Sequence, residues 1–261
     1  MHITILTVGS RGDVQPYLAL AGGLSRAGYQ VRVATHQPFQ AAVQERGLEF
    51  RPVEGNPREL LESEAGLAWL EAGRNPLAGT RRLLQLARPH VARLLADAVA
   101  ACQDTQAIIY APLGMAGCHI AQQQRVPSIL GALVPLTPTR AFPAAGALPW
   151  PLGGAYNLAT HLIAEQLGWQ SFRRQLNQWR RQTLGLAPVE LLGPGRRQRR
   201  HREPVLYGYR PSLVPKRPTE AATCTSPATG SPTPIPPGSL RPPWRGSWRA
   251  ALRRCMSALA A

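Results

Sequence analysis

The sequence predicts an α/β protein in which a parallel β-sheet is flanked by helices. The first observation is the apolar, β-branched run at residues 3–8, which is typical of a parallel strand buried on both faces. The second is that four more short apolar runs follow within the first 134 residues. The third is that helical patterns separate these runs, which indicates βαβ units with right-handed crossovers.

The expected elements follow one another without long gaps. After the first strand, a tight glycine turn at residues 9–12 leads into a helix over about 15–27, which ends at Gly28. Further strands are expected at residues 29–34, 48–53, 107–110 and 126–134. Further helices are expected at residues 38–46, 59–70, 77–101 and 114–124.

The composition changes after Pro135. Residues 135–154 are rich in proline, glycine, alanine and aromatic side chains and predict no regular element. A long helical pattern covers residues 155–183, and a last strand is expected at 205–209. From about Thr219 the chain is rich in proline, serine, threonine and arginine without periodicity. We therefore expect a folded domain over residues 1–218 and a disordered tail over 219–261.

The net charge of +16 over 261 residues is of a size found in nucleic-acid-binding proteins. The excess lies in the second half, however, and its arginine runs belong to no nucleic-acid-binding motif that we can identify. We favour solvated surfaces and expect no nucleic-acid partner. The four cysteines show no metal-ligand spacing, so we expect a reducing compartment and no metal site. Neither a signal peptide nor a membrane-spanning run is expected, which predicts a cytoplasmic protein.

The glycine turn after the first strand is the candidate functional site. Ligands bind at the carboxyl ends of the strands in such sheets, and glycine allows the backbone to come close to them. Asp13 could act as a general base, and Arg11 beside it could hold an anion. A role for Asp13 as the cap of the following helix is equally compatible with the sequence.

Two nucleotide-binding motifs fit this turn poorly. A dinucleotide site requires G-x-G-x-x-G and an acid about 20 residues further on. Here the glycines are Gly9 and Gly12, and the second strand ends at Thr35 and His36 without an acid. A P-loop is excluded because no Gly-Lys-Ser/Thr follows.

The turn and the segments after it resemble a known family. Residues 9–16 (GSRGDVQP), 18–24 (LALAGGL) and 27–35 (AGYQVRVAT) closely resemble the N-terminal domain of sterol glucosyltransferase-like enzymes. These are nucleotide-sugar-dependent glycosyltransferases of the two-domain GT-B type (glycosyltransferase family 28 N-terminal / family 1). Further matches lie at residues 47–50, 156–161, 179–186 and 205–212, so the resemblance covers roughly residues 1–218. It implies a Rossmann-like parallel sheet that forms the N-terminal half of a GT-B fold.

The resemblance also implies a division of labour. This half would bind a lipid, sterol or other hydrophobic acceptor, and a C-terminal domain would bind UDP-glucose or a related nucleotide sugar. The acceptor hydroxyl would attack the sugar directly, with inversion. Asp13 lies where relatives place a candidate catalytic base, and Gly9, Ser10, Arg11 and Gly12 would lie near the donor phosphates. Neither a metal nor a cofactor other than the donor substrate is implied.

Four residues are candidates for acceptor binding: His119, Trp150, Trp169 and Phe172. His119 follows the fourth strand and could line the cleft, while the aromatic side chains could form an apolar slot or a membrane-facing surface. Packing in the core is an open alternative for all four. The basic second half also allows peripheral contact with an anionic membrane at its cytoplasmic face. His36 and His161 are weaker candidates.

The tail departs from the family pattern. When the codons are read one base out of frame, residues 223–231 can encode NVHVTGYWF and residues 252–261 can encode PPPVYVGFGS. Both segments resemble the inter-domain linker and the first donor-domain strand of the family, in the same order. We therefore expect a frameshift between about Lys216 and Ala222, a missing donor domain and little or no transferase activity of the isolated chain. The alternative is a non-enzymatic half-domain that binds a lipid or a partner.

Overall fold

The computed structural model describes residues 1–56, 76–144, 146–193, 204–208 and 224–225. The chain divides into two compact units. The first unit comprises the described residues within Met1–Val53, Ala98–Pro135 and Glu203–Ala261. The second unit comprises those within Glu54–Asp97 and Leu136–Arg202.

The first unit is built on a parallel sheet with the strand order β3-β2-β1-β4-β5-β6-β7. The strands are β1 (His2–Leu6), β2 (Gln30–Thr35), β3 (Glu49–Pro52), β4 (Ala107–Tyr110), β5 (Ser128–Ala132), β6 (Val205–Tyr207) and β7 (Cys224–Thr225). The predicted parallel α/β sheet is therefore confirmed. The order first runs from β1 to β2 and β3, and then continues on the other side of β1 with β4. The carboxyl end of β1 is thus the point at which the topology switches, where such sheets bind ligands.

The helices of the described chain follow the predicted alternation with shifted boundaries. They are α1 (Arg11–Arg26), η1 (Gln37–Phe39), α2 (Gln40–Gln44), α5 (Pro76–Ala101), η2 (Pro112–Gly114), α6 (Ala116–Gln124) and α7 (Gly153–Gln182). The first helix begins four residues before the predicted start, because Ser10 and Asp13 cap it. The predicted helix over residues 59–70 lies outside the described residues.

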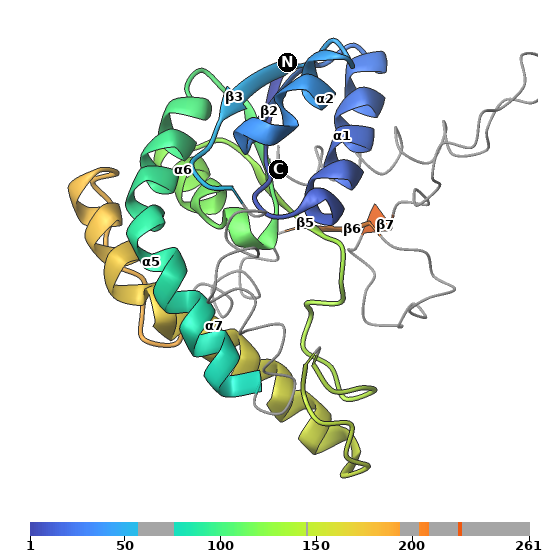
Figure 1. Ribbon diagram of the computed structural model, residues 1–261, viewed down its shortest axis with the longest axis vertical. Helices are drawn as coiled ribbons and strands as arrows, with labels where there is room; N and C mark the ends of the chain where they lie inside the picture. The colour runs from blue at the N-terminus through green and yellow to red at the C-terminus, as the bar shows by residue number, and fades with distance from the viewer. Residues whose placement is uncertain (57–75, 145, 194–203, 209–223, 226–261) are drawn as a thin grey trace, which may run out of the picture. The chain divides into compact units, whose positions relative to one another are not determined.

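Helices cover both faces of the sheet. On one face, Ile3 and Ile5 of β1 pack in a core cluster with Val14 and Leu18 of α1 and Val43 of α2. Figure 1 labels these helices and the strands of the sheet. On the opposite face lies α6. Side chains alternate between the two faces along a strand, so every side chain from Ile3 to Val8 can be buried only if both faces are covered. This explains the run of apolar and β-branched residues in the sequence.

The approach of α6 to the sheet depends on a small residue. A Cβ atom on Gly117 would lie 2.7 Å from Cβ of Tyr110 in β4 and 3.2 Å from a methyl carbon of Ile108. Tyr110 and Ile108 are fully buried in this contact. A larger residue at position 117 would push the helix off the sheet, since packed interiors accommodate little extra volume.

The buried side chain of Arg32 forms hydrogen bonds at the amino-terminal edge of the sheet. Arg32 of β2 is only 7% exposed and donates hydrogen bonds to the carbonyl of Ala101, the last residue of α5, at 3.0 Å and to that of Gln103 at 2.7 Å. Its Nε also donates to Glu49 Oε1 at 2.9 Å. Partial burial raises the pKa of Glu49, but the hydrogen bond and charge of Arg32 outweigh this effect and lower it below the ordinary value. The Arg32 side chain therefore binds two backbone carbonyls at the end of α5 and the carboxylate of Glu49 at the same time.

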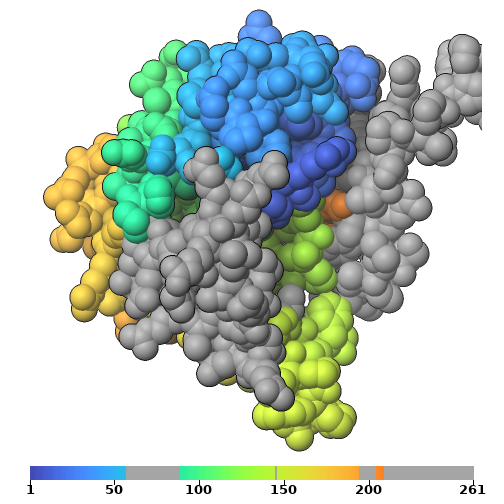
Figure 2. Space-filling view, in the orientation of Figure 1, coloured from blue at the N-terminus to red at the C-terminus, as the bar shows by residue number. Residues whose placement is uncertain are grey.

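The second unit contains an irregular loop that precedes α7. The described residues of this loop up to Leu152 form no helix or strand, as the sequence predicts, but α7 begins at Gly153, two residues before the predicted start of the helix at residue 155. Side chains of the first turns of α7 nevertheless bind its backbone at four places: Tyr156 to Leu148, Asn157 to Arg140, Thr160 to Ala144 and His161 to Phe142. Figure 2 shows the atoms of this loop closely packed, in yellow-green. The loop is irregular but fixed by its own helix.

The predicted tail is described at two residues only. Cys224 and Thr225 form β7, which pairs in parallel with Leu206 and Tyr207 of β6. The remainder of 219–261 lies outside the described residues, so the disordered tail and the frameshift stay predictions. Over the described part of the chain, no helix combines the length and apolar character needed to cross a bilayer.

Candidate functional site

The turn between β1 and α1 lies at the carboxyl end of β1. Gly9 adopts φ +137°, a conformation that side chains rarely allow. A Cβ atom on Gly9 would also lie 2.5 Å from Oδ2 of Asp13. Glycine is thus required at position 9 for two reasons, the backbone angle and the close approach of the Asp13 carboxylate.

The carboxylate of Asp13 is fixed by Ser10. The backbone N–H of Ser10 donates to Oδ2 at 2.8 Å, and the Ser10 hydroxyl donates to the same oxygen at 2.9 Å. The two residues form a capping box at the start of α1. The capping role of Asp13 is therefore confirmed.

Capping does not use the whole carboxylate. Among the described residues, no group donates a hydrogen bond to the second oxygen of Asp13, Oδ1. Ser10, Arg11 and Gly12 beside it are exposed, and Arg11 forms no ion pair within the described ranges. The turn therefore combines one oriented carboxylate oxygen with an exposed cation and the N–H groups of a helix start. The roles of these residues as base and phosphate ligands stay predictions.

Two buried side chains, Thr7 and His36, form hydrogen bonds with the backbone of this turn. The hydroxyl of Thr7, which is fully buried, donates to the backbone carbonyl of Asp13 at 3.1 Å. The N–H of Gly9 donates to Nε2 of His36 at 3.1 Å, and His36 Nδ1 lies 3.1 Å from the carbonyl oxygen of Val53. His36, which directly follows β2, is only 2% exposed. From the sequence His36 is only a weak candidate, although its place directly after a strand adjacent to β1 is a usable signal.

Tyr17 joins α1 to the carboxyl end of β5. Its hydroxyl donates to the carbonyl of Gly131 at 2.8 Å, across 114 residues of sequence. Burial, with a smaller contribution from the charge of Asp13, strongly raises the pKa of Tyr17. A Cβ atom at position 131 would lie 2.6 Å from the tyrosine ring, so glycine is needed there. Tyr17 holds α1 in place and stays protonated at neutral pH.

The predicted acceptor residues are divided between the two units. His119 is only 3% exposed and lies on α6, with Nδ1 3.7 Å from Sγ of Cys118. Its burial fits the packing alternative. The three aromatic candidates belong to the second unit, and their roles in acceptor binding stay predictions along with that of His119.

The aromatic candidates differ among themselves. Trp169 is buried, and its Nε1 donates to the carbonyl of Leu191 at 3.0 Å, which is typical of a packed residue. Phe172 is half-buried. Trp150 is 54% exposed, and its ring centre lies 6.0 Å from that of Tyr156. Only Trp150 presents most of its surface to solvent.

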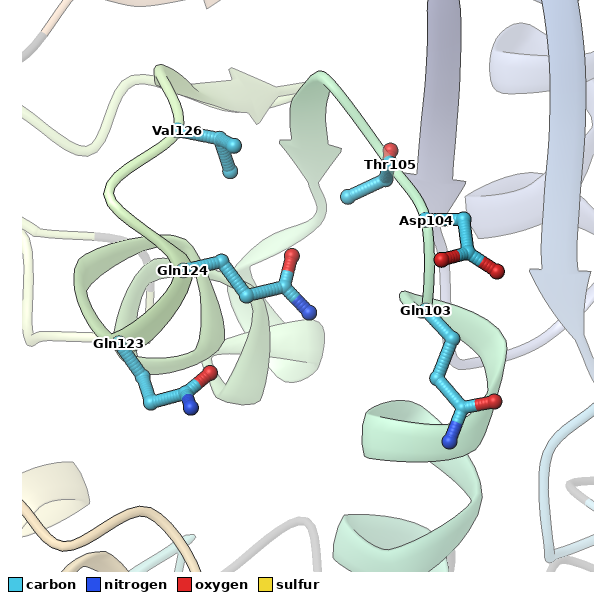
Figure 3. A pocket seen from close by; sticks show the side chains of 6 residues that line it. All are labelled: Gln103, Asp104, Thr105, Gln123, Gln124 and Val126. Atoms are coloured by element: carbon cyan, nitrogen blue, oxygen red, sulfur yellow. The ribbon is translucent and has the colours of Figure 1, made fainter.

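A pocket lies at the opposite, amino-terminal edge of the sheet. It has a volume of about 460 Å³, and its lining consists of Gln103, Asp104, Thr105, Gln123, Gln124 and Val126 (Figure 3). Gln124 is committed to the fold, since its side-chain amide donates to the carbonyl of Cys102 at 2.9 Å. None of the predicted site residues lines this pocket.

The described residues contain no group of three or more histidine, cysteine or acidic side chains arranged to hold a metal. Burial raises the pKa of the Cys102 thiol to about 12, so it is protonated at neutral pH and is a poor ligand. The second free cysteine of the described chain, Cys118, donates to the carbonyl of Met115 at 3.1 Å.

Comparison with known proteins assigns the family. Residues 3–143 match the glycosyltransferase family 28 N-terminal domain. The chain belongs to this family. It is 39% identical over 216 residues to a sterol 3-beta-glucosyltransferase of Aspergillus fumigatus, and this alignment covers 82% of the chain and 15% of the relative. It is 37% identical over 215 residues to the sterol 3-beta-glucosyltransferase of Sclerotinia sclerotiorum, covering 82% of the chain and 14% of the relative. The chain thus aligns with about one-seventh of the length of these relatives.

Solved structures agree on the fold of this family 28 domain. The glycotransferase of kitacinnamycin matches with a TM-score of 0.56 at 20% identity, over 93% of this chain and 55% of that one. The spinosyn forosaminyltransferase SpnP matches with a TM-score of 0.50 at 15% identity, over 94% and 54% of the two chains. At such identities the likeness concerns the fold alone, the Rossmann-like N-terminal half of a GT-B glycosyltransferase.

Proposed function

We propose that this family 28 domain is the acceptor-binding half of a sterol 3-beta-glucosyltransferase-like enzyme. In that reaction a sugar passes from UDP-glucose or a related nucleotide sugar to the hydroxyl of a sterol, lipid or other hydrophobic acceptor. The observation that carries the proposal is the glycine turn in which Ser10 fixes one oxygen of Asp13 and leaves the other uncommitted. The sequence likeness to sterol 3-beta-glucosyltransferases supports the substrate class.

Asp13 is the proposed general base. Its Oδ1 accepts the proton of the acceptor hydroxyl while that oxygen attacks the anomeric carbon. The bond from this carbon to the diphosphate breaks on the opposite side, and the electron pair leaves with the nucleotide, which accounts for inversion. The two hydrogen bonds from Ser10 keep the carboxylate in one orientation, so little reorganisation is needed when the acceptor binds.

The start of α1 is the proposed contact with the donor phosphates. Ser10, Arg11 and Gly12 are exposed there, and the N-terminus of a helix favours negative charge. Arg11 would stabilise the charge that develops on the leaving diphosphate, which makes a metal ion unnecessary for this step. The remaining donor contacts belong to a donor domain, because GT-B enzymes bind the donor mainly in their other half.

The test is a transfer assay with UDP-[14C]glucose and a 3β-hydroxysterol. The chain is assayed alone and together with the separately produced donor domain of the Aspergillus fumigatus relative. We expect glucosylated sterol only when the donor domain is present, because the chain alone holds one reactant. Asp13→Asn lowers the rate roughly 10²- to 10⁴-fold, the usual contribution of a general base.

The matched control is Asp104→Asn, which changes an exposed carboxylate at the other edge of the sheet. It should transfer at the wild-type rate. Full activity of the Asp13→Asn variant would exclude Asp13 as the base. Binding of a fluorescent sterol to the chain alone tests the acceptor half separately, and an absence of binding would exclude the acceptor assignment.

We also propose that the second unit touches an anionic membrane at its cytoplasmic face. The exposed apolar side chains Leu148, Trp150 and Leu152, with exposed fractions of 53%, 54% and 63%, support this proposal. Apolar and aromatic side chains on a fixed loop can enter the interface between headgroups and acyl chains. In a non-enzymatic half-domain the same loop would be the lipid-binding element.

Co-sedimentation with phosphatidylglycerol vesicles at low salt tests membrane contact. We expect Trp150→Ser to reduce the bound fraction several-fold, because an interfacial tryptophan contributes strongly to partitioning. Leu113→Ser is the control, since it removes an exposed apolar side chain, 67% exposed, from the first unit. Equal binding of all three proteins would contradict the role of the loop.

A further inference from the structure

The imidazole of His36 connects the carboxyl ends of three neighbouring strands. Nε2 accepts the N–H of Gly9 after β1, and Nδ1 contacts the carbonyl oxygen of Val53 after β3, each at 3.1 Å. His36 itself directly follows β2, whose last residue, Thr35, accepts the N–H of Val53 at 2.9 Å. One buried side chain thus links three chain segments at the ends of strands that are already paired in the sheet.

These contacts define one protonation state of the ring. The N–H of Gly9 is a donor, so Nε2 must present its lone pair. The carbonyl of Val53 is an acceptor, so Nδ1 must carry the hydrogen. A neutral ring with its proton on Nδ1 satisfies both contacts at once. A proton on Nε2 would face the Gly9 N–H and break that contact.

The bond to Gly9 acts directly on the candidate base. Gly9 precedes Ser10, and the N–H of Ser10 is one of the two donors to Asp13 Oδ2. The peptide groups of Gly9 and Ser10 are consecutive, so the direction of the first limits the direction of the second. A rotation at Gly9 would turn the Ser10 N–H away from the carboxylate and change the orientation of Oδ1.

We propose that His36 is a positioning residue for Asp13, acting as the neutral Nδ1–H tautomer through the Gly9 peptide. It reaches no reacting atom itself, since it is 2% exposed. The statement that Asp13 is the base rests on the proposed function. The statement that His36 orients the turn does not, and it can be tested in the chain without any substrate.

Two substitutions at position 36 test the contacts of the two ring nitrogens separately. The side-chain oxygen of glutamine can occupy the place of Nε2 and accept the Gly9 N–H. The side-chain amide of asparagine reaches only the place of Nδ1 and can still donate to the carbonyl of Val53. His36→Gln therefore keeps the contact that matters in the proposal, and His36→Asn loses it.

The experiment is NMR spectroscopy of the full 261-residue chain labelled with ¹⁵N. Long-range correlations of the His36 ring report the tautomer, which should be Nδ1–H. In His36→Asn the amide of Gly9 should exchange with solvent roughly tenfold faster, as expected for loss of one hydrogen bond. The proton shift of the Ser10 amide should also move toward its unbonded value. His36→Gln should retain both wild-type signals.

Two controls separate positioning from general damage to the fold. The amide of Ile5 in β1 should keep its slow exchange in every variant. His161→Asn changes another buried histidine, which binds the carbonyl of Phe142 in the second unit at 3.1 Å, and should leave Gly9 and Ser10 unchanged. If His36→Asn does not fold, the ring tautomer and the spectrum of His36→Gln decide the proposal.

Three results would overturn the proposal: a ring protonated on Nε2, equal Gly9 exchange in wild type and His36→Asn, or faster Gly9 exchange without any change at Ser10. The last result would leave His36 a purely structural role. None of these measurements depends on sugar transfer, so a failure of the proposed function in the transfer assay would be a distinct outcome.

Discussion

The β1–α1 turn and the loop before α7 are both irregular segments, and both are held by side chains that bind backbone groups. The turn is fixed by hydrogen bonds with the buried side chains of Thr7 and His36. It presents polar groups, namely the Asp13 carboxylate and the Arg11 cation. The loop is held by the helix that follows it and presents apolar groups, with Trp150 the largest. The same device, side chains that satisfy irregular backbone, thus prepares one segment for acid–base chemistry and the other for an apolar surface.

The largest effect on the β1–α1 turn is expected from a substitution at Gly9. We expect Gly9→Ala to lower the free energy of unfolding by about 2–3 kcal/mol, since alanine would adopt a strained backbone angle and collide with Asp13. Urea denaturation followed by circular dichroism measures this loss. Gly23→Ala is the matched control, because a Cβ atom there meets nothing within 4 Å. As a helix-interior substitution it should stabilise the chain by roughly 0.5–1 kcal/mol. Equal stability of the two variants would show that the turn is not constrained as described.

The corresponding change in the loop is Thr160→Val. The Thr160 hydroxyl accepts the N–H of Ala144 at 2.9 Å, and valine removes this acceptor with little change in shape. We expect a loss of about 1–2 kcal/mol, the cost of a buried donor without a partner. The loss should be local, so proteolytic cleavage within the loop should accelerate while the amides of β1 keep their protection. Loss of protection in β1 would mean that the loop and the sheet unfold as one.

The smallest effect is expected at the amino-terminal edge of the sheet, at the opposite end of the strands from the β1–α1 turn. The pKa of Glu49 is lowered, so its ion pair with Arg32 stabilises the fold above the ordinary pKa of a glutamate. This contribution disappears as the pH falls through the lower folded-state pKa. Because the Glu49 side chain is 41% exposed, solvent screens the pair, and we expect Glu49→Gln to cost less than about 1 kcal/mol at neutral pH. Urea denaturation of both proteins at several acidic pH values should show the difference vanish. A difference that persists at the lowest pH would assign the effect to packing.

Most of the first unit could be predicted from local pattern. The run at residues 3–8 consists of apolar and β-branched side chains, and the run at 107–110 is similarly apolar, because these strands are covered on both faces. The start of α1 was predicted four residues late, although Ser10 and Asp13 have the three-residue spacing of a capping box. In the structure this pair caps α1, so the helix begins at Arg11 rather than at about Gln15.

The sequence by itself determined the succession of strands and helices along the chain, the glycine turn after β1, the residues of the family motif and the irregular character of the loop before α7. These features depend on neighbouring residues, whose side-chain periodicity and backbone preferences act over a few positions. Only the tertiary structure decided which distant groups meet, such as Gly9 with His36 across 27 residues and Tyr17 with Gly131 across 114. Such contacts depend on strand order and on the angle at which helices lie on the sheet, and both are set by the packing of the whole core rather than by any local pattern.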